Sequence, residues 1–154
     1  VFHRYLLHSE NHWLPNHPQA MAFHFLLHGV HHSFPHDKYH LVFPIVPGYI
    51  ALNIVMYPLK LYLPTHIMGS VCAGFMFAYV YYDMVHYWFH NSSPQNSYMK
   101  SLKAHHMQHH YRDGKMGFGI SSRFWDHVFW TDGRLQPAKV EKTVEIKGPV
   151  VLTK

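Results

Sequence analysis

The sequence contains one cysteine, Cys72, which lies within an apolar run. A single thiol cannot form a disulfide framework, and it cannot supply the several thiolates that structural zinc sites usually contain. We therefore expect Cys72 to be a small packing residue. Any metal site in this chain must use other ligands.

Charged residues are also scarce. Asp, Glu, Lys and Arg make up 14% of the 154 residues, against about 25% in ordinary soluble domains. Aromatic residues reach 17%, a combination typical of chains that meet lipid and its interface. The formal charge of +5 suits anionic headgroups. Because no Lys/Arg stripe or recognition motif is present, we expect no nucleic-acid partner.

The length suits one domain. The sequence begins Val-Phe-His-Arg, without Met and inside a periodic segment, so we expect a fragment of a longer protein. We assign residues 1–135 to one domain. Residues 136–154 are polar, and we assign them to a C-terminal tail.

Two long uncharged runs, residues 41–57 and 67–82, flank a short connection that contains Lys60 and Pro64. Each run falls just short of the roughly 18 residues that indicate a secure spanning helix. We predict a hairpin of two membrane helices, the first broken near Pro44 and Pro47. The alternative is a buried hairpin in a soluble protein.

The remaining segments are predicted to be helices and loops. Helices are expected over 19–32 and 98–111, with the end of another at the N-terminus and a short amphipathic piece over 123–130. The segments rich in Pro, Asn, Ser or Gly are predicted to be loops. The fold class is therefore all-α: a membrane-embedded helical hairpin plus a helical cap.

Eighteen histidines are present, and their spacing matters more than their number. His106, His109 and His110 stand at i, i+3 and i+4 and therefore share one helix face. His28, His31 and His32 repeat this pattern. Consecutive residues lie about 100° apart around a helix, so each cluster can serve two adjacent ions more naturally than one.

Two further pairs complete the set. His86 and His90 stand at i, i+4, whereas His3 and His8 stand at i, i+5 and need a helix end or a π-type turn to converge. The candidate metal ligands are the ten imidazoles of these four segments: His3, His8, His28, His31, His32, His86, His90, His106, His109 and His110. Ten ligands suffice for two five-coordinate ions. Buried imidazoles without a shared partner are the alternative, and they would leave many polar groups unpaired.

Other residues are candidates for contacting these ligands. His24 and His105 each precede a candidate ligand by four residues, and Asp83 precedes His86 by three. A carboxylate near the ligands would orient the rings and offset the charge of the ions. Asp37, Asp113 and Asp126 flank the other segments, although a cap or surface role suits any of them equally well. The six histidines without such spacing are expected to be ordinary: His12, His17, His36, His40, His66 and His127.

Ligand type alone does not select the metal, because imidazole suits zinc, copper, iron and nickel. Ten imidazoles without thiolate exceed what a structural zinc site needs, so a redox-capable pair is favoured, with iron and dioxygen the obvious candidates. The sequence has no HExxH motif, nucleophile elbow or phosphate-binding glycine loop. It has no flavin or haem signature either, so electrons must come from elsewhere.

At these residues the sequence resembles the fatty acid hydroxylase superfamily of membrane di-metal oxygenases. The His-rich boxes of that family match HRYLLH (3–8), HGVHH (28–32), HYWFH (86–90) and HMQHH (106–110). The resemblance narrows to the fatty acid 2-hydroxylase branch through FHFLLHGVHH, DKYHLVFPIVP, YDMVHYWFH, SLKAHHMQHH and GFGISSRFWD. It covers residues 1–131.

The resemblance implies hydroxylation at C2 of a long-chain fatty acid, free or as the N-acyl chain of a sphingolipid such as ceramide. It implies an endoplasmic reticulum membrane with the metal site on the cytosolic side, and electrons from the haem of a cytochrome b5, fused upstream or separate. Iron is implied for activity, and zinc for some isolated members. The rivals are a related sterol or alkyl-lipid oxidase and a non-catalytic metal-binding membrane protein.

The resemblance also divides the ligands between two ions. One metal takes His3, His8, His28, His32 and His109. The other takes His31, His86, His90, His106 and His110.

Overall fold

The computed structural model describes residues 1–133, and the predicted tail, 136–154, lies outside them. Within the described residues every regular element is helical, so the predicted all-α class is confirmed. The elements are η1 (His3–Leu7), η2 (Ser9–Asn11), α1 (Pro18–His24), η3 (Phe25–Gly29), α2 (Val30–Ser33), α3 (Ile45–Tyr62), α4 (Thr65–Asn91), α5 (Ser97–Tyr111) and α6 (Phe124–Val128).

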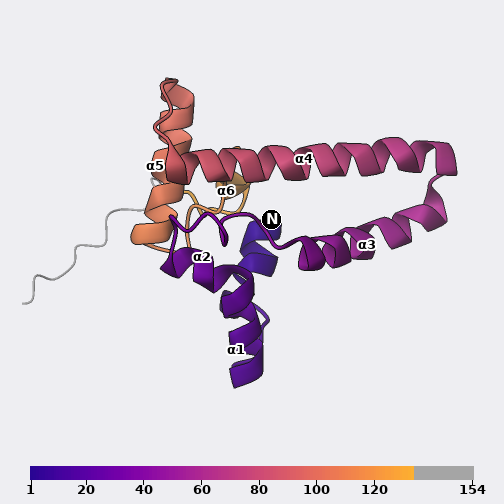
Figure 1. Cartoon of the computed structure of the whole chain (residues 1–154), viewed down its shortest axis with the longest axis horizontal. Helices are drawn as coiled ribbons and strands as arrows, with labels where there is room; N and C mark the ends of the chain where they lie inside the picture. Colours follow the sequence, from indigo (N-terminus) through magenta and orange to yellow (C-terminus); the bar gives the residue numbers. More distant parts are fainter. Residues whose placement is uncertain (134–154) are drawn as a thin grey trace, which may run out of the picture.

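Helices α3 and α4 form the long hairpin that dominates Figure 1. The predicted break near Pro44 and Pro47 is wrong, because α3 begins directly after Pro44 and carries Pro47 in its first turn. The first backbone N–H groups of a helix have no partner within the helix, so proline removes no bond there. The proline inside α3 is Pro58, close to its end.

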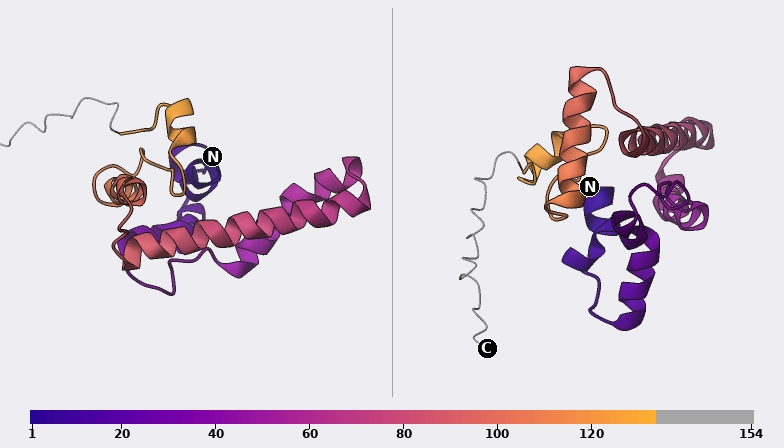
Figure 2. Two further views of the ribbon diagram at one scale, coloured as in Figure 1. Left: turned by 90° about the horizontal axis from the view of Figure 1, so that it is seen from above. Right: turned by 60° about the vertical axis from the view of Figure 1, so that its left-hand side comes forward.

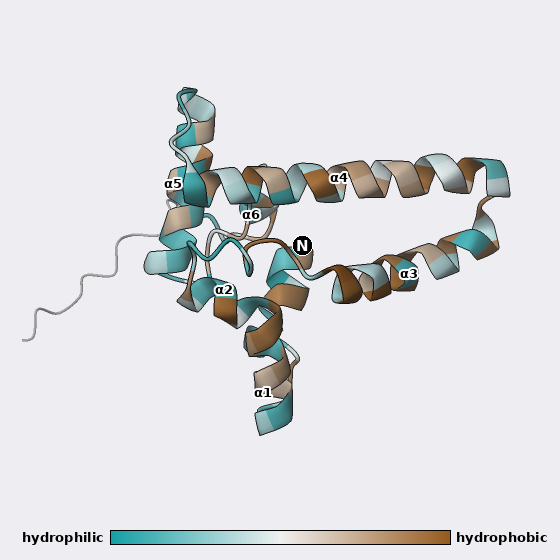
Figure 3. Ribbon diagram, in the orientation of Figure 1, coloured by the Kyte–Doolittle hydropathy of each residue, from teal (hydrophilic) through white to brown (hydrophobic). Residues whose placement is uncertain are grey.

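Figure 3 shows many hydrophobic residues along α3, and most of its large apolar side chains are exposed. Ile45 is 82% exposed and Leu61 69%, whereas Met56 is buried. Among the helices of residues 1–133, α3 alone is long and apolar enough to cross a membrane by length and composition. The prediction of two spanning helices is therefore supported for α3 and not for α4.

The buried core lies at the other end of the hairpin, where α5 passes the end of α4 (Figure 2). Val85 and Phe89 of α4, Leu102 of α5 and Ile120 of the following loop pack together. The Asn96 side chain caps the start of α5 by accepting the backbone N–H groups of the first turn. This core fixes the direction in which α4 and α5 present their histidines.

The N-terminal segments contain two π-type turns. Element η1 is a π-helix, and η3 is a second one placed between α1 and α2. Together α1, η3 and α2 cover the helix predicted over 19–32, beginning one residue earlier, at Pro18. Single π-type turns within helices often mark functional sites, and both of these lie next to histidine boxes.

Candidate metal centre

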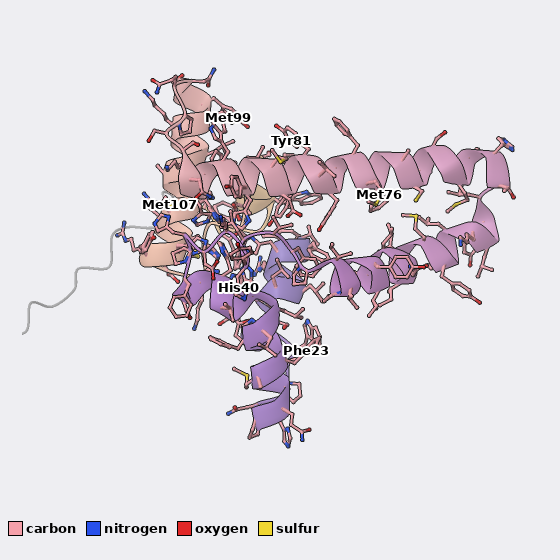
Figure 4. All side chains as sticks on the ribbon, in the orientation of Figure 1. Phe23, His40, Met76, Tyr81, Met99 and Met107 are labelled. Atoms are coloured by element: carbon pink, nitrogen blue, oxygen red, sulfur yellow. The ribbon has the colours of Figure 1, made fainter. Side chains whose placement is uncertain are left out.

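The four histidine segments meet where η1, η3 with α2, the end of α4, and α5 come together. Figure 4 shows a concentration of nitrogen-bearing side chains in this region, between the labelled Met107 and His40. The imidazoles form two groups, and in each group the five candidate ligand atoms lie within 4.8 Å of one another. The first group is His3, His8, His28, His32 and His109, and the second group is His31, His86, His90, His106 and His110.

Local backbone geometry explains this division. The π-type turn of η1 carries a hydrogen bond from the His8 N–H to the His3 carbonyl, 3.1 Å, and brings these two rings to one side. Consecutive histidines separate, as the 100° step of a helix requires: His109 joins the first group and His110 the second. The groups coincide with the two ligand sets that the family resemblance implies. Metal binding by them remains a prediction.

Three of the five rings in the first group donate from Nδ1 to oxygen acceptors. His3 donates to the Phe118 carbonyl at 2.7 Å, His109 to the Met116 carbonyl at 2.7 Å, and His8 to Glu10 Oε1 at 3.1 Å. In a neutral imidazole, a proton on Nδ1 leaves the lone pair on Nε2. These three rings therefore aim their lone pairs inward.

The inward-facing atoms are very close. His8 Nε2 lies 3.0 Å from His109 Nε2 and 3.1 Å from His32 Nε2. His28 Nε2 lies 3.1 Å from His3 Nε2. Lone pairs on His8 and His109 that face each other at this distance repel, unless a cation lies between them.

Protonation cannot relieve this repulsion near neutral pH. Burial, reinforced by the other imidazoles, lowers the pKa of His8 to about 2. Burial lowers the pKa of His109 to about 4 and that of His32 to about 3. The rings are therefore neutral, which is the form that binds metal.

The second group has the same inner geometry with fewer outer partners. His90 Nε2 lies 2.9 Å from His106 Nε2, and His31 Nε2 lies 3.1 Å from His110 Nε2. The Nδ1 atoms of these four rings are buried and have no hydrogen-bond partner among the described residues. Ring-to-ring contacts hold them instead, with centroids 4.6 Å apart between His31 and His110 and 5.0 Å between His90 and His106.

Both groups fit a metal ion by donor chemistry and by spacing. Imidazole nitrogens bind first-row metals at about 2.0–2.1 Å, so two adjacent ligands at about a right angle would lie roughly 3.0 Å apart. The nitrogen–nitrogen distances of 2.9–3.1 Å match this value. The groups adjoin one another, since the rings of His32 and His110 stack at 4.2 Å.

The residues predicted to support the ligands behave differently from one another. His24 Nε2 lies 2.7 Å from Glu10 Oε2, so it contacts the carboxylate behind His8. His105 Nε2 donates to Asp126 Oδ2 at 2.8 Å. Asp83 is buried on α4 but makes no hydrogen bond to any of the ten imidazoles.

Sequence reasoning missed Glu10, the one carboxylate that accepts directly from a grouped histidine within residues 1–133. It lies in η2, in a stretch expected to be a loop, and its position two residues after His8 was the available signal. Asp37 and Asp113 make local turns, with His40 and with the Lys115 N–H respectively.

The six histidines expected to be ordinary belong to neither group. The ring of His36 donates from Nδ1 to the His90 carbonyl at 3.1 Å.

Comparison with known proteins gives a direct result. Residues 1–131 match the sequence profile described as fatty acid hydroxylase. The chain belongs to the fatty acid hydroxylase family. The matched range ends where the resemblance to this family was expected to end.

Relatives within the fatty acid hydroxylase family agree with the 2-hydroxylase branch. The chain is 42% identical over 136 residues to fatty acid 2-hydroxylase of Homo sapiens, covering 85% of this chain and 35% of the relative. It is 41% identical over 135 residues to ceramide very long chain fatty acid hydroxylase scs7 of Schizosaccharomyces pombe, covering 88% and 39%. Dihydroceramide fatty acyl 2-hydroxylase FAH2 of Arabidopsis thaliana is 37% identical over 133 residues, and the match covers 85% of this chain and 54% of that relative.

A solved structure has the same fold. The structure described as full-length scs7p, with only the hydroxylase domain visible, superposes with a TM-score of 0.80 at 41% identity. The match covers 88% of this chain and 51% of that one. The chain thus spans about a third of the human relative's length and about half of the visible scs7p chain.

Proposed function

We propose that this chain forms the di-metal catalytic part of a fatty acid 2-hydroxylase. It would act on C2 of a long-chain fatty acid, free or as the N-acyl chain of ceramide. In the balanced reaction, one oxygen atom of dioxygen enters the C2–H bond and the other leaves as water, with two electrons and two protons consumed. The electrons would come from a cytochrome b5, fused upstream or separate.

One observation carries this proposal: the Nε2 atoms of His8 and His109 face each other at 3.0 Å while both Nδ1 atoms donate to oxygen. Two neutral imidazoles held in that arrangement need a cation between them. The family match and the names of the relatives support the choice of a hydroxylase over a metal-storage role.

The proposed cofactor is a pair of iron ions, one in each group, with zinc as the alternative in isolated protein. When bound, redox-active ions would supply the activation of dioxygen that breaking a C–H bond requires. The chain's own part is to hold ten neutral nitrogens in place and to keep water away from the site. Eight of the ten imidazoles are buried, which serves both purposes.

A cavity of about 350 Å³ beside the first group is the proposed place for part of the substrate. His3 lines it together with Arg4, Tyr82 and Phe118. An acyl chain would bury its methylene groups against the aromatic rings, which favours binding by removing apolar surface from water. The related sterol and alkyl-lipid oxidases are the rival to be tested through the product.

We place the protein in the endoplasmic reticulum membrane with the metal centre on the cytosolic side. The 18 residues of α3 span about 27 Å and the 27 residues of α4 about 40 Å, against a hydrocarbon core of about 30 Å. A hairpin that begins in the membrane at the α3–α4 turn would therefore carry His86 and His90 beyond the hydrocarbon. The exposed apolar surface of α3 supports contact with lipid.

The test is lipid analysis of cells that lack their own 2-hydroxylase and express the full-length protein. We expect 2-hydroxy fatty acids in the sphingolipid fraction, and oxidation of reduced cytochrome b5 that depends on added fatty acid. A hydroxylated sterol as the product would favour the rival oxidase. Metal binding without oxygen consumption would contradict the enzymatic proposal.

A further inference from the structure

The first group is supported from behind by one short backbone segment, residues 116–119. The Met116 carbonyl accepts the Nδ1 proton of His109, and the Phe118 carbonyl accepts that of His3, both at 2.7 Å. The tautomer and the orientation of these two rings therefore depend on where this segment lies. An acceptor on the outer nitrogen of a metal-binding histidine also makes its inner nitrogen a better ligand.

The segment is held by a buried carboxylate that touches neither ring. Asp126, 2% exposed, accepts the Phe118 N–H on Oδ1 at 3.1 Å and the Gly119 N–H on Oδ2 at 2.7 Å. Thr131 Oγ1 donates to Oδ1 at 2.7 Å, and His105 Nε2 donates to Oδ2 at 2.8 Å. Each carboxylate oxygen thus accepts two hydrogen bonds, as many as its lone pairs allow.

These hydrogen bonds keep the carboxylate ionised. Burial alone would raise the pKa of Asp126, but the hydrogen bonds from His105, Thr131 and the Gly119 N–H outweigh it and leave the pKa below its usual value. Charge-assisted hydrogen bonds of this kind are stronger than neutral ones. Asp126 is therefore a firm anchor for the segment.

The backbone of the segment is shaped to approach this carboxylate. A Cβ atom on Gly119 would lie 2.2 Å from the Ser122 carbonyl oxygen and 2.7 Å from Asp126 Oδ2, so only glycine fits. Gly117 has a φ of 71°, which favours glycine, and its N–H donates to the Thr131 carbonyl at 2.8 Å. Gly119 thus allows the chain to pass close to Asp126, and Gly117 provides the backbone conformation in which its N–H reaches Thr131.

The geometry points to Asp126 as a positioning residue for the ion of the first group. The Gly119 N–H that Asp126 accepts belongs to the same peptide unit as the Phe118 carbonyl, which accepts from His3. The Met116 carbonyl, which accepts from His109, shares its peptide unit with the Gly117 N–H, and that N–H donates to Thr131, whose side chain is bound to Asp126. Among the described residues, four rings of the second group, His31, His90, His106 and His110, have no hydrogen-bond partner on Nδ1, so we expect the effect of Asp126 to fall on the ion of the first group. The inference rests on the proposed metal binding and adds a residue that contacts no metal.

The test is Asp126→Asn in the full-length protein, with cobalt(II) as the probe for both sites. Asparagine keeps the shape and one acceptor oxygen, but its NH₂ group cannot accept the Gly119 N–H. We expect cobalt at one of the two sites to bind about 10–100-fold more weakly, the range typical of lost outer-sphere partners. The ion at the other site should keep its wild-type affinity in competition with a chelator.

The affected site is identified by comparing absorption spectra. His28→Ala removes a candidate ligand of the first group, so the cobalt absorption bands lost in this variant are assigned to that group. The bands that weaken in Asp126→Asn should be the same bands. Gly119→Ala, which pushes the segment away from Asp126, should reproduce the effect. Asp37→Asn removes an exposed carboxylate that contacts neither group and serves as the matched control.

Two results would overturn the inference: wild-type affinity at both sites in Asp126→Asn, or equal weakening of both sites together with a lower unfolding temperature. The second result would make Asp126 a general structural residue. A wild-type protein that binds no metal would instead overturn the proposed function, and the inference with it. The wild-type titration therefore separates the two failures.

Discussion

The two imidazole groups share an inner geometry but are held in different ways. In the first group, three rings are fixed by hydrogen bonds to Glu10, Met116 and Phe118, which lie in loops or short helices. In the second group, four rings have no such partner among the described residues and are held by helix packing and ring contacts. One centre is therefore built by two different means: polar anchoring on one side and packing on the other.

The largest expected effect comes from removing ligands of the second group. His86→Ala, His106→Ala or His110→Ala should abolish 2-hydroxy lipid formation and lower the metal content of the full-length protein, as measured by lipid and metal analysis. His66→Ala, at the exposed start of α4, is the matched control and should change neither. Full product with two of the three ligands replaced would show that the second group is not a metal site.

The packing that supports the second group is tested by Phe89→Ala. Phe89 is fully buried between α4 and α5 and precedes His90. Its truncation should destabilise the protein by about 3–5 kcal/mol and weaken the second-group ion more than the first. Thermal unfolding and metal titration measure the two effects. Equally weaker binding of both ions would show that this packing does not support the second group in particular.

The polar anchoring of the first group is tested by Glu10→Gln. The amide keeps an acceptor for His8 but lacks the negative charge, which also lies 2.7 Å from His24 Nε2. We expect first-group affinity to fall by about 10-fold or somewhat more, without loss of the second ion. Asp113→Asn, at an exposed turn, is the control. Unchanged first-group affinity in a chelator competition would show that Glu10 does not support metal binding by this group.

The smallest effect is expected at the helix that serves both groups. Asn96→Ala removes the cap of α5 and should cost about 1 kcal/mol of stability. Because α5 is also held by the core, each ion should bind with the same affinity as in the wild-type protein. A selective loss of either ion, detected in the same cobalt titration, would show that the end of α5 is coupled to one group.

Local spacing made much of this architecture predictable. The i, i+3 and i, i+4 patterns indicated the ligand helices, and the i, i+5 spacing of His3 and His8 called for the π-type turn that η1 provides. These patterns follow from the periodicity of the helix, which can be read directly from the positions of the histidines in the sequence. The apolar run of α3 was predictable for the same reason.

Contacts across long sequence separations were less accessible. Asp126 could be named as a candidate near the last box, but its hydrogen bonds to residues 118 and 119 depend on how a glycine-rich loop folds back. Glu10 was missed because it lies in a stretch without helical periodicity. The break predicted near Pro44 and Pro47 failed because proline is tolerated in a first helical turn.

The pairs His31–His32 and His109–His110 each place one residue in either group. In each pair a single peptide unit, with about 3.8 Å between its Cα atoms, joins the two groups. A shift of α2 or α5 along its axis would therefore move one residue of each group at the same time.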